Sequence, residues 1–345
     1  MTEHRSGAGW WRDSVFYRVD VRSFADADGD GVGDLDGVLS RLGYLELLGV
    51  DAIVLSGVGG LDYEPESLEA LLSEAHHAGI RLMVAMDLDP ARDDPREVLG
   101  AWLDLGVDGF HLDPREGASE PVRAVVDRYP ERVVIGSGPG WQLGFNLDLA
   151  VAGFDAEAVQ DAITRVLFAG DPRPAWAMAT RETARDEAAL TPVRAMALVQ
   201  LGLPGAVCLR HGEELGLPGT QRMPMPWEGE KPPFGFSAAE GEWPSISAEW
   251  APFTVESQLE DPHSTLSLYR RALELRNEHP AFRGDEVEWF GAPDGCLAFR
   301  RAGSELTCAL NTTSEPVPVP PGEVLLSSRP LIGGQLPEGS AVWLC

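Results

Sequence analysis

Acidic side chains recur at almost every second position of one short segment near the N-terminus. The segment reads DADGDGVGD, and a glycine stands at its sixth position, where a loop of oxygen ligands must turn sharply. Carboxylates and one backbone carbonyl at this spacing are the ligands with which proteins wrap a hard cation. The sequence therefore predicts a structural Ca²⁺ (or Mg²⁺) site with these ligands: Asp26, Asp28, Asp30, the carbonyl of Val32, and Asp34.

This segment differs from an ordinary EF-hand in two ways. Its twelfth position is Gly37, where an EF-hand has a bidentate Glu, and a strand-like run rather than a helix precedes it. The alternative interpretation is an acidic turn that is only hydrated. Because four closely spaced carboxylates repel one another unless something neutralises them, the pattern favours a bound cation.

The elements that must position such residues alternate between short apolar runs and amphipathic helical stripes. One stripe is formed by Leu35, Leu39, Leu42 and Leu45, at the spacing of a helix with one buried face. A repeated strand–helix order implies a parallel sheet, and eight such units predict a (β/α)₈ barrel, with an open doubly wound sheet as the rival. The predicted strands are residues 15–19, 52–55, 82–86, 109–112, 133–135, 145–147, 175–178 and 206–209.

The pattern changes near residue 285. A helix over residues 265–277 would close the barrel, and short strands separated by turn residues follow it without helices between them. This predicts two domains, a barrel over residues 1–284 and a compact antiparallel β domain over residues 285–345. The predicted strands of the second domain are 287–290, 296–300, 306–310, 323–326 and 341–344.

Charge and composition exclude several classes of function. The chain has 345 residues and a net charge of −28, so it should repel phosphate backbones and anionic membranes, and we expect no nucleic-acid or membrane partner. Residues 1–9 lack the apolar core of a signal peptide, and no stretch reaches membrane-spanning length. Four scattered cysteines without a CxxC pair then predict a reduced, cytoplasmic protein.

Several motifs in a fixed order resemble the bacterial α-glucosidases and oligo-1,6-glucosidases of the α-amylase family. The likeness covers nearly the whole chain, and it implies the barrel, the small β domain and a cation in the acidic loop. The motifs are WWRDSVFY (10–17), RSF (22–24), GVDAIVLS (49–56), GVDGFHLD (106–113), LPG (203–205), GEELG (212–216), MPMPW (223–227), YRRALELR (269–276) and AFR (298–300).

The resemblance also assigns the catalytic positions, and most of them are altered. Asp113 occupies the nucleophile position at the end of strand four. Ser137 stands where the family has its acid/base Glu, and Glu182 replaces the third carboxylate, an Asp, after strand seven. A retaining glycosidase needs two carboxyl groups roughly 5 Å apart. Because Ser137 cannot act as a general acid, a loss on the order of 10²–10⁴ in rate is expected from this change alone.

The expected substrate-binding residues are altered in the same way. His111 replaces the Arg two residues before the nucleophile, and Arg181 lies beside the altered third carboxylate. Asp87 lies at the end of strand three, and His211 at the end of strand eight, the face where barrel sites lie. Only about 25 residues separate Asp87 from Asp113, so the domain that the family inserts there is missing.

Three functions remain open on the sequence alone. The favoured one is a non-catalytic or severely impaired glycosidase homologue that binds α-glucosides or a partner protein. The enzymatic alternative is residual or altered hydrolysis or transglycosylation of α-glucosides using Asp113. The third is an adopted non-sugar function at the mouth of the barrel, left wide by the missing domain.

Overall fold

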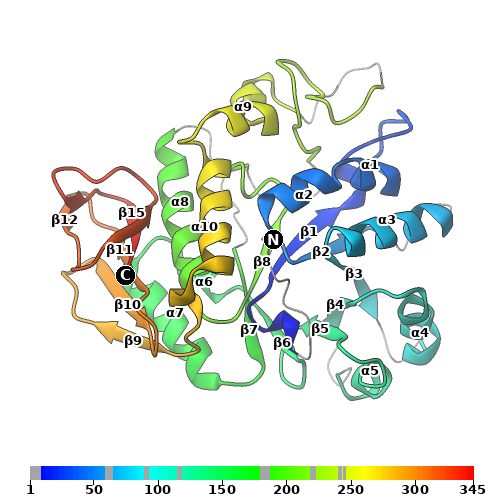
Figure 1. The fold of residues 1–345 in the computed structure, drawn as a ribbon, viewed down its shortest axis with the longest axis horizontal. Coiled ribbons are helices and arrows are strands. Elements are labelled where there is room, and N and C mark those ends of the chain that lie inside the picture. Colours follow the sequence, from blue (N-terminus) through cyan, green and yellow to red (C-terminus); the bar gives the residue numbers. More distant parts are fainter. Residues whose placement is uncertain are drawn as a thin grey trace.

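The computed structural model is a closed eight-stranded parallel barrel with a second, antiparallel sheet at its side (Figure 1). It describes residues 9–58, 65–88, 93–114, 119–178, 187–217, 223–239, 243 and 246–345. Strands β1 to β8 follow one another around the barrel in chain order, and β8 pairs with β1. This confirms the predicted barrel and excludes the open doubly wound sheet.

All eight predicted barrel strands are present, with ends that differ by one or two residues from the predicted ones. Their inward positions alternate with positions that face the surrounding helices, as the pleat of a strand requires. The strands are β1 (Val15–Asp20), β2 (Ala52–Ser56), β3 (Arg81–Leu88), β4 (Gly109–Pro114), β5 (Val133–Gly136), β6 (Leu143–Asn146), β7 (Arg173–Ala177) and β8 (Ala206–Arg210).

Helices cover the outside of the barrel, and short 3₁₀ turns, η1 (Trp10–Asp13), η2 (Val21–Ser23), η4 (Ala248–Phe253) and η5 (Pro280–Phe282), join several elements. The α-helices are α1 (Leu35–Ser40), α2 (Leu42–Leu48), α3 (Pro65–His77), α4 (Pro95–Leu105), α5 (Ser119–Val126), α6 (Asp148–Ala152), α7 (Ala156–Ala169), α8 (Glu187–Gly202), α9 (Val255–Glu260) and α10 (Thr265–Glu278).

Local sequence explains where many of these helices begin and end. The side chains of Asp34, Asp94, Asp155 and Ser264 each accept a hydrogen bond from a backbone N–H in the first turn of the helix that follows. Such caps satisfy N–H groups that have no partner inside the helix, and each typically contributes about 1 kcal/mol. Helix α4 also ends at Gly106, which has the left-handed conformation that glycine adopts easily.

The connection between β5 and β6 departs from the prediction of eight strand–helix units. Residues 137–142 form bends and turns, so no helix lies between these two strands. The pairing explains how so short a link can join parallel strands: Ile135 lies beside Leu143 and Gly136 beside Gly144, so β6 begins where β5 ends. The chain has little distance to travel back, and the crossover helix of the usual unit is unnecessary.

Trp141 fills the space at this irregular connection. Its side chain is buried, and its ring lies over Gly136, where an added Cβ would come within 2.8 Å of the indole. The indole N–H donates a hydrogen bond to the carbonyl of Ser137 at 3.1 Å. A glycine is therefore required at the end of β5, and the tryptophan fixes the turn that follows it.

Two apolar cores meet at the barrel wall. The inner core contains Phe16, Val54, Met83 and Ile135 from four different strands, and Trp10 from η1 packs against it before β1 begins. The larger outer core lies between the strands and the helices. The barrel is thus a filled structure in which only the carboxyl ends of the strands are available for a site.

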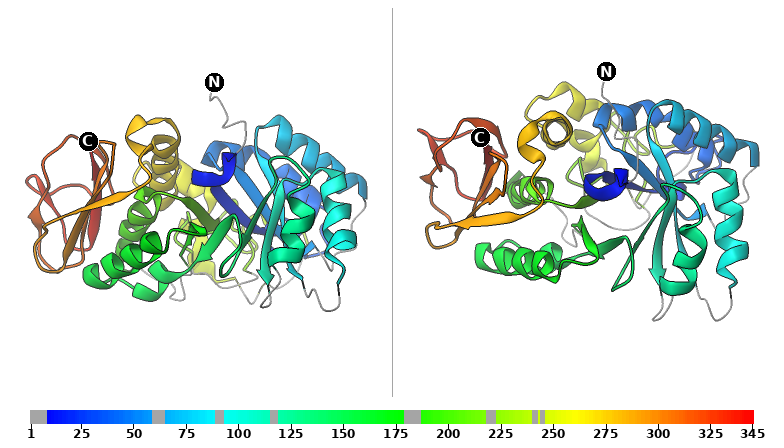
Figure 2. Two further views of the ribbon diagram at one scale, coloured as in Figure 1. Left: turned by 90° about the horizontal axis from the view of Figure 1, so that it is seen from below. Right: turned by 60° about the horizontal axis from the view of Figure 1, so that its bottom comes forward.

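The C-terminal sheet packs against one side of the barrel through α8 (Figure 2). The buried indole of Trp343 in this sheet donates a hydrogen bond to the carbonyl of Leu198 at 2.9 Å. The five predicted strands are present, together with a two-stranded ribbon that the sequence did not indicate. The strands are β9 (Val287–Phe290), β10 (Cys296–Arg301), β11 (Thr307–Asn311), β13 (Val324–Ser327) and β15 (Ser340–Leu344), and the ribbon is β12 (Val317–Pro318) and β14 (Gln335–Leu336).

In the described part of the chain, no helix combines the length and the apolar character that crossing a bilayer requires. All four cysteines are unpaired, and Cys208 and Cys308 are buried in the cores.

Candidate functional site

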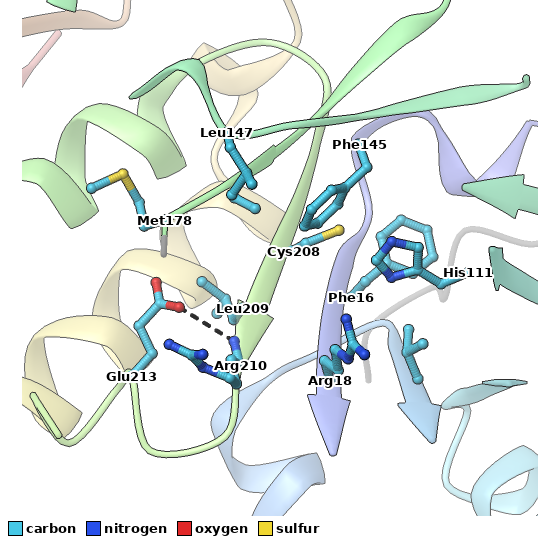
Figure 3. A pocket seen from close by; sticks show the side chains of 12 residues that line it. Phe16, Arg18, His111, Phe145, Leu147, Met178, Cys208, Leu209, Arg210 and Glu213 are labelled. Atoms are coloured by element: carbon cyan, nitrogen blue, oxygen red, sulfur yellow. Dashed lines mark hydrogen bonds between the residues drawn. The ribbon is translucent and has the colours of Figure 1, made fainter. Parts of the chain in front are cut away.

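The carboxyl ends of the barrel strands surround a cavity of about 90 Å³ (Figure 3). This is well below the roughly 300–1,000 Å³ of ordinary small-molecule sites, so the cavity itself would hold one end of a ligand, and the rest of the ligand would lie at the open end of the barrel. Its wall is mostly apolar, with aromatic side chains from β1 and β6. The polar and charged residues that line it are Arg18, His111, Arg210 and Glu213.

His111 lies in this cavity, as expected for a substrate-binding position. Its ring is nearly buried and packs against Phe145, with 4.6 Å between the ring centroids. Burial, together with the nearby charge of Arg18, lowers the pKa of His111 to about 3. The imidazole is therefore neutral at pH 7 and does not supply the fixed positive charge of the Arg that it replaces.

Asp87 and Asp113 lie at the mouth of the barrel on neighbouring strands. Their backbones are paired in the register of β3 and β4, two positions beyond the pairing of Ala85 with His111. The side chain of Asp87 is exposed, whereas that of Asp113 lies outside the described residues. The fold thus places the position of the expected nucleophile at the carboxyl end of β4.

Ser137 is exposed in the turn after β5 and does not line the cavity. Its backbone carbonyl is bonded to the indole of Trp141. Arg181 and Glu182, the remaining residues expected near the reaction centre, lie outside the described residues.

His211 follows β8 and is likewise absent from the wall of the cavity. Its Nδ1 accepts a hydrogen bond from the backbone N–H of Asp20 at 3.2 Å, and its ring makes an edge contact with Phe24. Burial, with the charge of Arg210, lowers the pKa of His211 to about 4. These contacts show a neutral imidazole that joins the ends of β1 and β8.

Arg18 and Arg210 are two residues of the cavity wall that the predicted site does not include. Each arginine lies in a strand at a position that faces the inside of the barrel, and both line the cavity. A charged residue at an inward strand position is unusual, because burial of an unpaired charge is unfavourable. This alternation with period two would have indicated both residues.

A buried network of acidic and phenolic groups lies behind the cavity. Glu214 accepts hydrogen bonds from the hydroxyls of Tyr17 and Tyr44, each at 2.6 Å, and Glu213 accepts one from Tyr269 at 3.4 Å. Burial raises the pKa of Glu213 to about 8 and that of Glu214 to about 7. These glutamates therefore hold protons near neutral pH.

The acidic loop brings three of its predicted ligands together. Carboxylate oxygens of Asp26, Asp28 and Asp34 lie within 4.8 Å of one another, while Asp30 is not part of this cluster. Asp30 instead accepts a hydrogen bond from the backbone N–H of Val32 at 2.7 Å. Although the N–H of Asp30 stabilises ionised Asp28, burial and the three neighbouring carboxylates leave the pKa of Asp28 raised.

The loop of residues 223–239 packs directly onto this acidic loop. Asp26 donates its backbone N–H to the carbonyl of Phe236 at 2.9 Å and accepts a hydrogen bond from the hydroxyl of Ser237 at 2.5 Å. Trp227 is buried, donates to the carbonyl of Phe24 at 2.8 Å and stacks under the guanidinium of Arg41. Trp227 is thus a packing residue and is not available to a sugar.

Comparisons with known proteins agree with this architecture. The profile of the family described as "Alpha amylase, catalytic domain" matches residues 19–59 and 177–285. An α-glucosyl transfer enzyme of known structure has a TM-score of 0.77 and 22% identity, with 99% of each chain covered. A trehalulose synthase has a TM-score of 0.79 and 17% identity, with 98% of this chain and 100% of the other covered.

Sequence relatives point to one branch of that family. A probable α-glucosidase of Rhizobium meliloti is 23% identical over 497 positions, with 89% of this chain and 90% of the relative covered. An oligo-1,6-glucosidase of Halalkalibacterium halodurans is 37% identical over 103 residues, which are 25% of this chain and 18% of that enzyme. The fold and the comparisons thus confirm the predicted resemblance to the α-amylase family. More narrowly, the chain is α-glucosidase-like.

The distribution of the matches is informative. The profile leaves out residues 60–176, the part that contains the expected site positions 87, 111, 113 and 137. The alignment with the Rhizobium relative spans 497 positions, more than the 345 residues of this chain, so that relative carries segments that this chain lacks. The family profile therefore does not extend over the segment that holds these four positions, although the alignment with the Rhizobium relative covers 89% of this chain.

Proposed function

We propose that this chain is an α-glucosidase homologue that binds an α-glucoside at the barrel mouth and has lost ordinary hydrolytic turnover. The observation that carries the proposal is Ser137. The residue at the acid/base position is a serine, exposed in a turn and outside the cavity wall. A hydroxyl of ordinary acidity cannot protonate a leaving glycosidic oxygen, a role for which glycosidases use a carboxylic acid.

Two further features support the loss of turnover. The neutral imidazole of His111 supplies no fixed charge two residues before Asp113. Strands β3 and β4 are joined by a short segment that contains α4, which leaves no room for an inserted domain at this side of the mouth. In an open site, solvent screens the charge that develops in a transition state, and electrostatic stabilisation is weaker.

The alternative function is residual hydrolysis or transglycosylation that uses Asp113 as the nucleophile. The observation that favours it is the position of the Asp113 backbone, which is kept at the carboxyl end of β4 beside Asp87. In that case the enzyme would form a glycosyl ester on Asp113 and release it to water or to a second sugar.

The two functions are separated by measuring turnover and binding on the same preparation. We expect no release of nitrophenol from aryl α-glucosides above the rate of the Asp113→Ala variant, and a calorimetric binding signal with maltose or isomaltose. Hydrolysis by wild type that Asp113→Ala abolishes would establish the alternative instead. Absence of binding to both disaccharides would exclude the proposed ligand class.

Restoring the missing acid alone should not restore the enzyme. Groups of a catalytic set act as a unit, so one repaired member returns little of the lost rate. We expect Ser137→Glu to remain within about tenfold of wild type on an activated aryl α-glucoside, since His111 and Glu182 stay altered. The comparison is with the triple variant Ser137→Glu, His111→Arg, Glu182→Asp. Substantial turnover by the single variant would mean that the remaining site is already organised for catalysis.

The acidic loop is proposed to hold a structural Ca²⁺ (or Mg²⁺). The crowded carboxylates of Asp26, Asp28 and Asp34 are the ligands that a hard cation prefers, and such an ion would neutralise their mutual repulsion. It would also fix the contacts of Asp26 with Ser237 and Phe236, which hold residues 223–239 over the barrel.

Removal of the cation should lower stability. A ligand present at a hundred times its Kd adds about 2.7 kcal/mol to the folded state. We expect chelator to lower the Tm of metal-loaded protein, and Asp28→Asn to weaken this response, while Asp36→Asn, in the first turn of α1, should keep it. Identical melting curves with and without chelator, in protein shown to contain the metal, would disprove the site.

A further inference from the structure

Two arginines occupy paired positions at the mouth of the barrel. Arg18 of β1 and Arg210 of β8 are partners in the parallel register, and both side chains line the cavity (Figure 3). Like charges at neighbouring positions of adjacent strands are destabilising. The register therefore places two arginines at neighbouring positions of adjacent strands, with both side chains in the wall of one cavity.

Neither arginine has a close side-chain partner within the described part of the chain. Neither guanidinium takes part in an ion pair or a side-chain hydrogen bond among those residues, although Arg81, Arg132 and Arg173 elsewhere each pair with a carboxylate. Arg18 and Arg210 thus differ from these three arginines, each of which has a carboxylate partner.

Glu213 is the one carboxyl group in the described cavity wall, and although its charge attracts Arg210, no ion pair joins the two side chains. Its Oε2 accepts a hydrogen bond from the backbone N–H of Arg210 at 3.3 Å, and its Oε1 faces the hydroxyl of Tyr269. Because burial raises its pKa to about 8, Glu213 is mostly uncharged at pH 7. The neighbouring imidazole of His111 is uncharged as well.

The result is a local positive charge in a protein whose net charge is −28. We propose that the barrel mouth binds the anionic group, phosphoryl or carboxylate, of a small sugar-sized ligand between Arg18 and Arg210. A guanidinium presents a planar fork of N–H donors that matches the oxygens of a phosphate or a carboxylate, and such charge-assisted bonds are among the strongest. The volume of about 90 Å³ suits a single group of this kind.

The remaining wall indicates how the rest of the ligand would lie. Phe16 and Phe145 provide apolar surface beside the arginines, and neutral His111 can donate one hydrogen bond. An anionic group held by the arginines would leave its sugar ring at the open end of the barrel. This inference uses the same cavity as the proposed function, but it does not require that an uncharged α-glucoside binds.

The test is calorimetric titration of the whole protein at low ionic strength in a phosphate-free buffer. The first probe is inorganic phosphate, which carries the charge without a sugar. Glucose 1-phosphate, glucuronate and glucose then separate a phosphoryl ligand from a carboxylate ligand and from an uncharged sugar. We expect an anionic probe to bind more tightly than glucose, and to bind more weakly as salt is added, because salt screens the attraction.

Variants show whether the arginines are responsible. Arg18→Gln and Arg210→Gln should each weaken binding of the anionic probe by between about tenfold and a hundredfold, the range expected for one charge-assisted contact. Arg210→Lys should lose less, because it keeps the charge but not the fork. Arg271→Gln on α10, which removes an exposed arginine paired with Glu274, is the matched control and should bind as wild type does.

The possible outcomes are distinct from those of the proposed function. Phosphate binding that depends on Arg18 and Arg210 supports this inference even if maltose does not bind. Failure of every anionic probe to bind folded wild-type protein overturns it, even if maltose does bind. Equal binding by wild type and by both glutamine variants, checked for folding by circular dichroism, also overturns it, since the anion would then lie elsewhere.

Discussion

Arg276→Leu is expected to lower the free energy of unfolding by about 3–5 kcal/mol. The guanidinium of Arg276 is buried on α10 and donates hydrogen bonds to the carbonyls of Leu201, Leu203 and Gly205. These carbonyls belong to the end of α8 and the turn before β8. Removal of the charged donor would leave buried carbonyls without partners and would loosen the last helix from the barrel.

The measurement is urea unfolding followed by circular dichroism, with Arg271→Leu as the matched control. Arg271 lies on the same helix, but its side chain is exposed and pairs with Glu274. Its loss should change stability by no more than about 0.5 kcal/mol. If the two variants lose similar stability, the buried hydrogen bonds of Arg276 contribute little, and the contacts around it must be reassessed.

Glu213→Gln is expected to make the free energy of unfolding less sensitive to a rise in pH. Burial raises the pKa of Glu213 from 4.5 to about 8, so the folded state keeps a proton that the unfolded chain releases above pH 4.5. Stability from this group is present at low pH and is lost as pH rises through the folded value, by about 1.4 kcal/mol per pH unit. Glutamine has no proton to lose, and this part of the pH dependence disappears.

The contribution of Glu213 to stability is measured most clearly between pH 6.5 and 8. Below pH 6.5, His111 and His211 change the stability in the opposite direction. Burial lowers the pKa of His111 from 6.5 to about 3 and that of His211 to about 4, so acid destabilises the folded state. Between pH 6.5 and 8, the free energy of unfolding of wild type should fall by on the order of 2 kcal/mol because of Glu213. Glu214, with a pKa of about 7, adds a smaller decrease near pH 6.5 to 7. Unfolding free energies at both pH values would reveal this loss. An unchanged slope in Glu213→Gln, matched by the exposed control Glu274→Gln, would contradict the assignment.

Much of the fold follows from local patterns in the sequence. Helical spacing predicted that Leu266, Tyr269 and Leu273 form one buried face of a helix, and they do so in α10. The eight barrel strands likewise lie at the apolar runs of the sequence. The pattern failed at the link between β5 and β6, because a long-range pairing rather than local propensity made a helix unnecessary there. Strands β12 and β14 have two residues each, too short for any alternation to be visible.

The candidate site was less predictable than the fold. The resemblance directed attention to His111 and to the position of Asp113, and both lie at the carboxyl end of the barrel. It gave no indication of Arg18 or Arg210, since neither belongs to a catalytic motif. Local alternation marks each of them as an inward residue, but their placement next to each other depends on the register between β1 and β8, which joins opposite ends of the barrel sequence.

The strands on the two sides of the cavity differ in how many residues pair with the neighbouring strand, because of the short link after β5. On one side, β8, β1 and β2 are held together by pairing along four or five residues of each strand. On the other, β6 joins β5 only through Leu143 and Gly144, yet it carries Phe145 into the cavity wall. Strand β6 is therefore held mainly from its other side, where four of its residues, Phe145 among them, pair with β7. The position of Phe145 in the cavity wall thus depends on β7, whereas the positions of the two arginines depend on the pairing of β8 with β1.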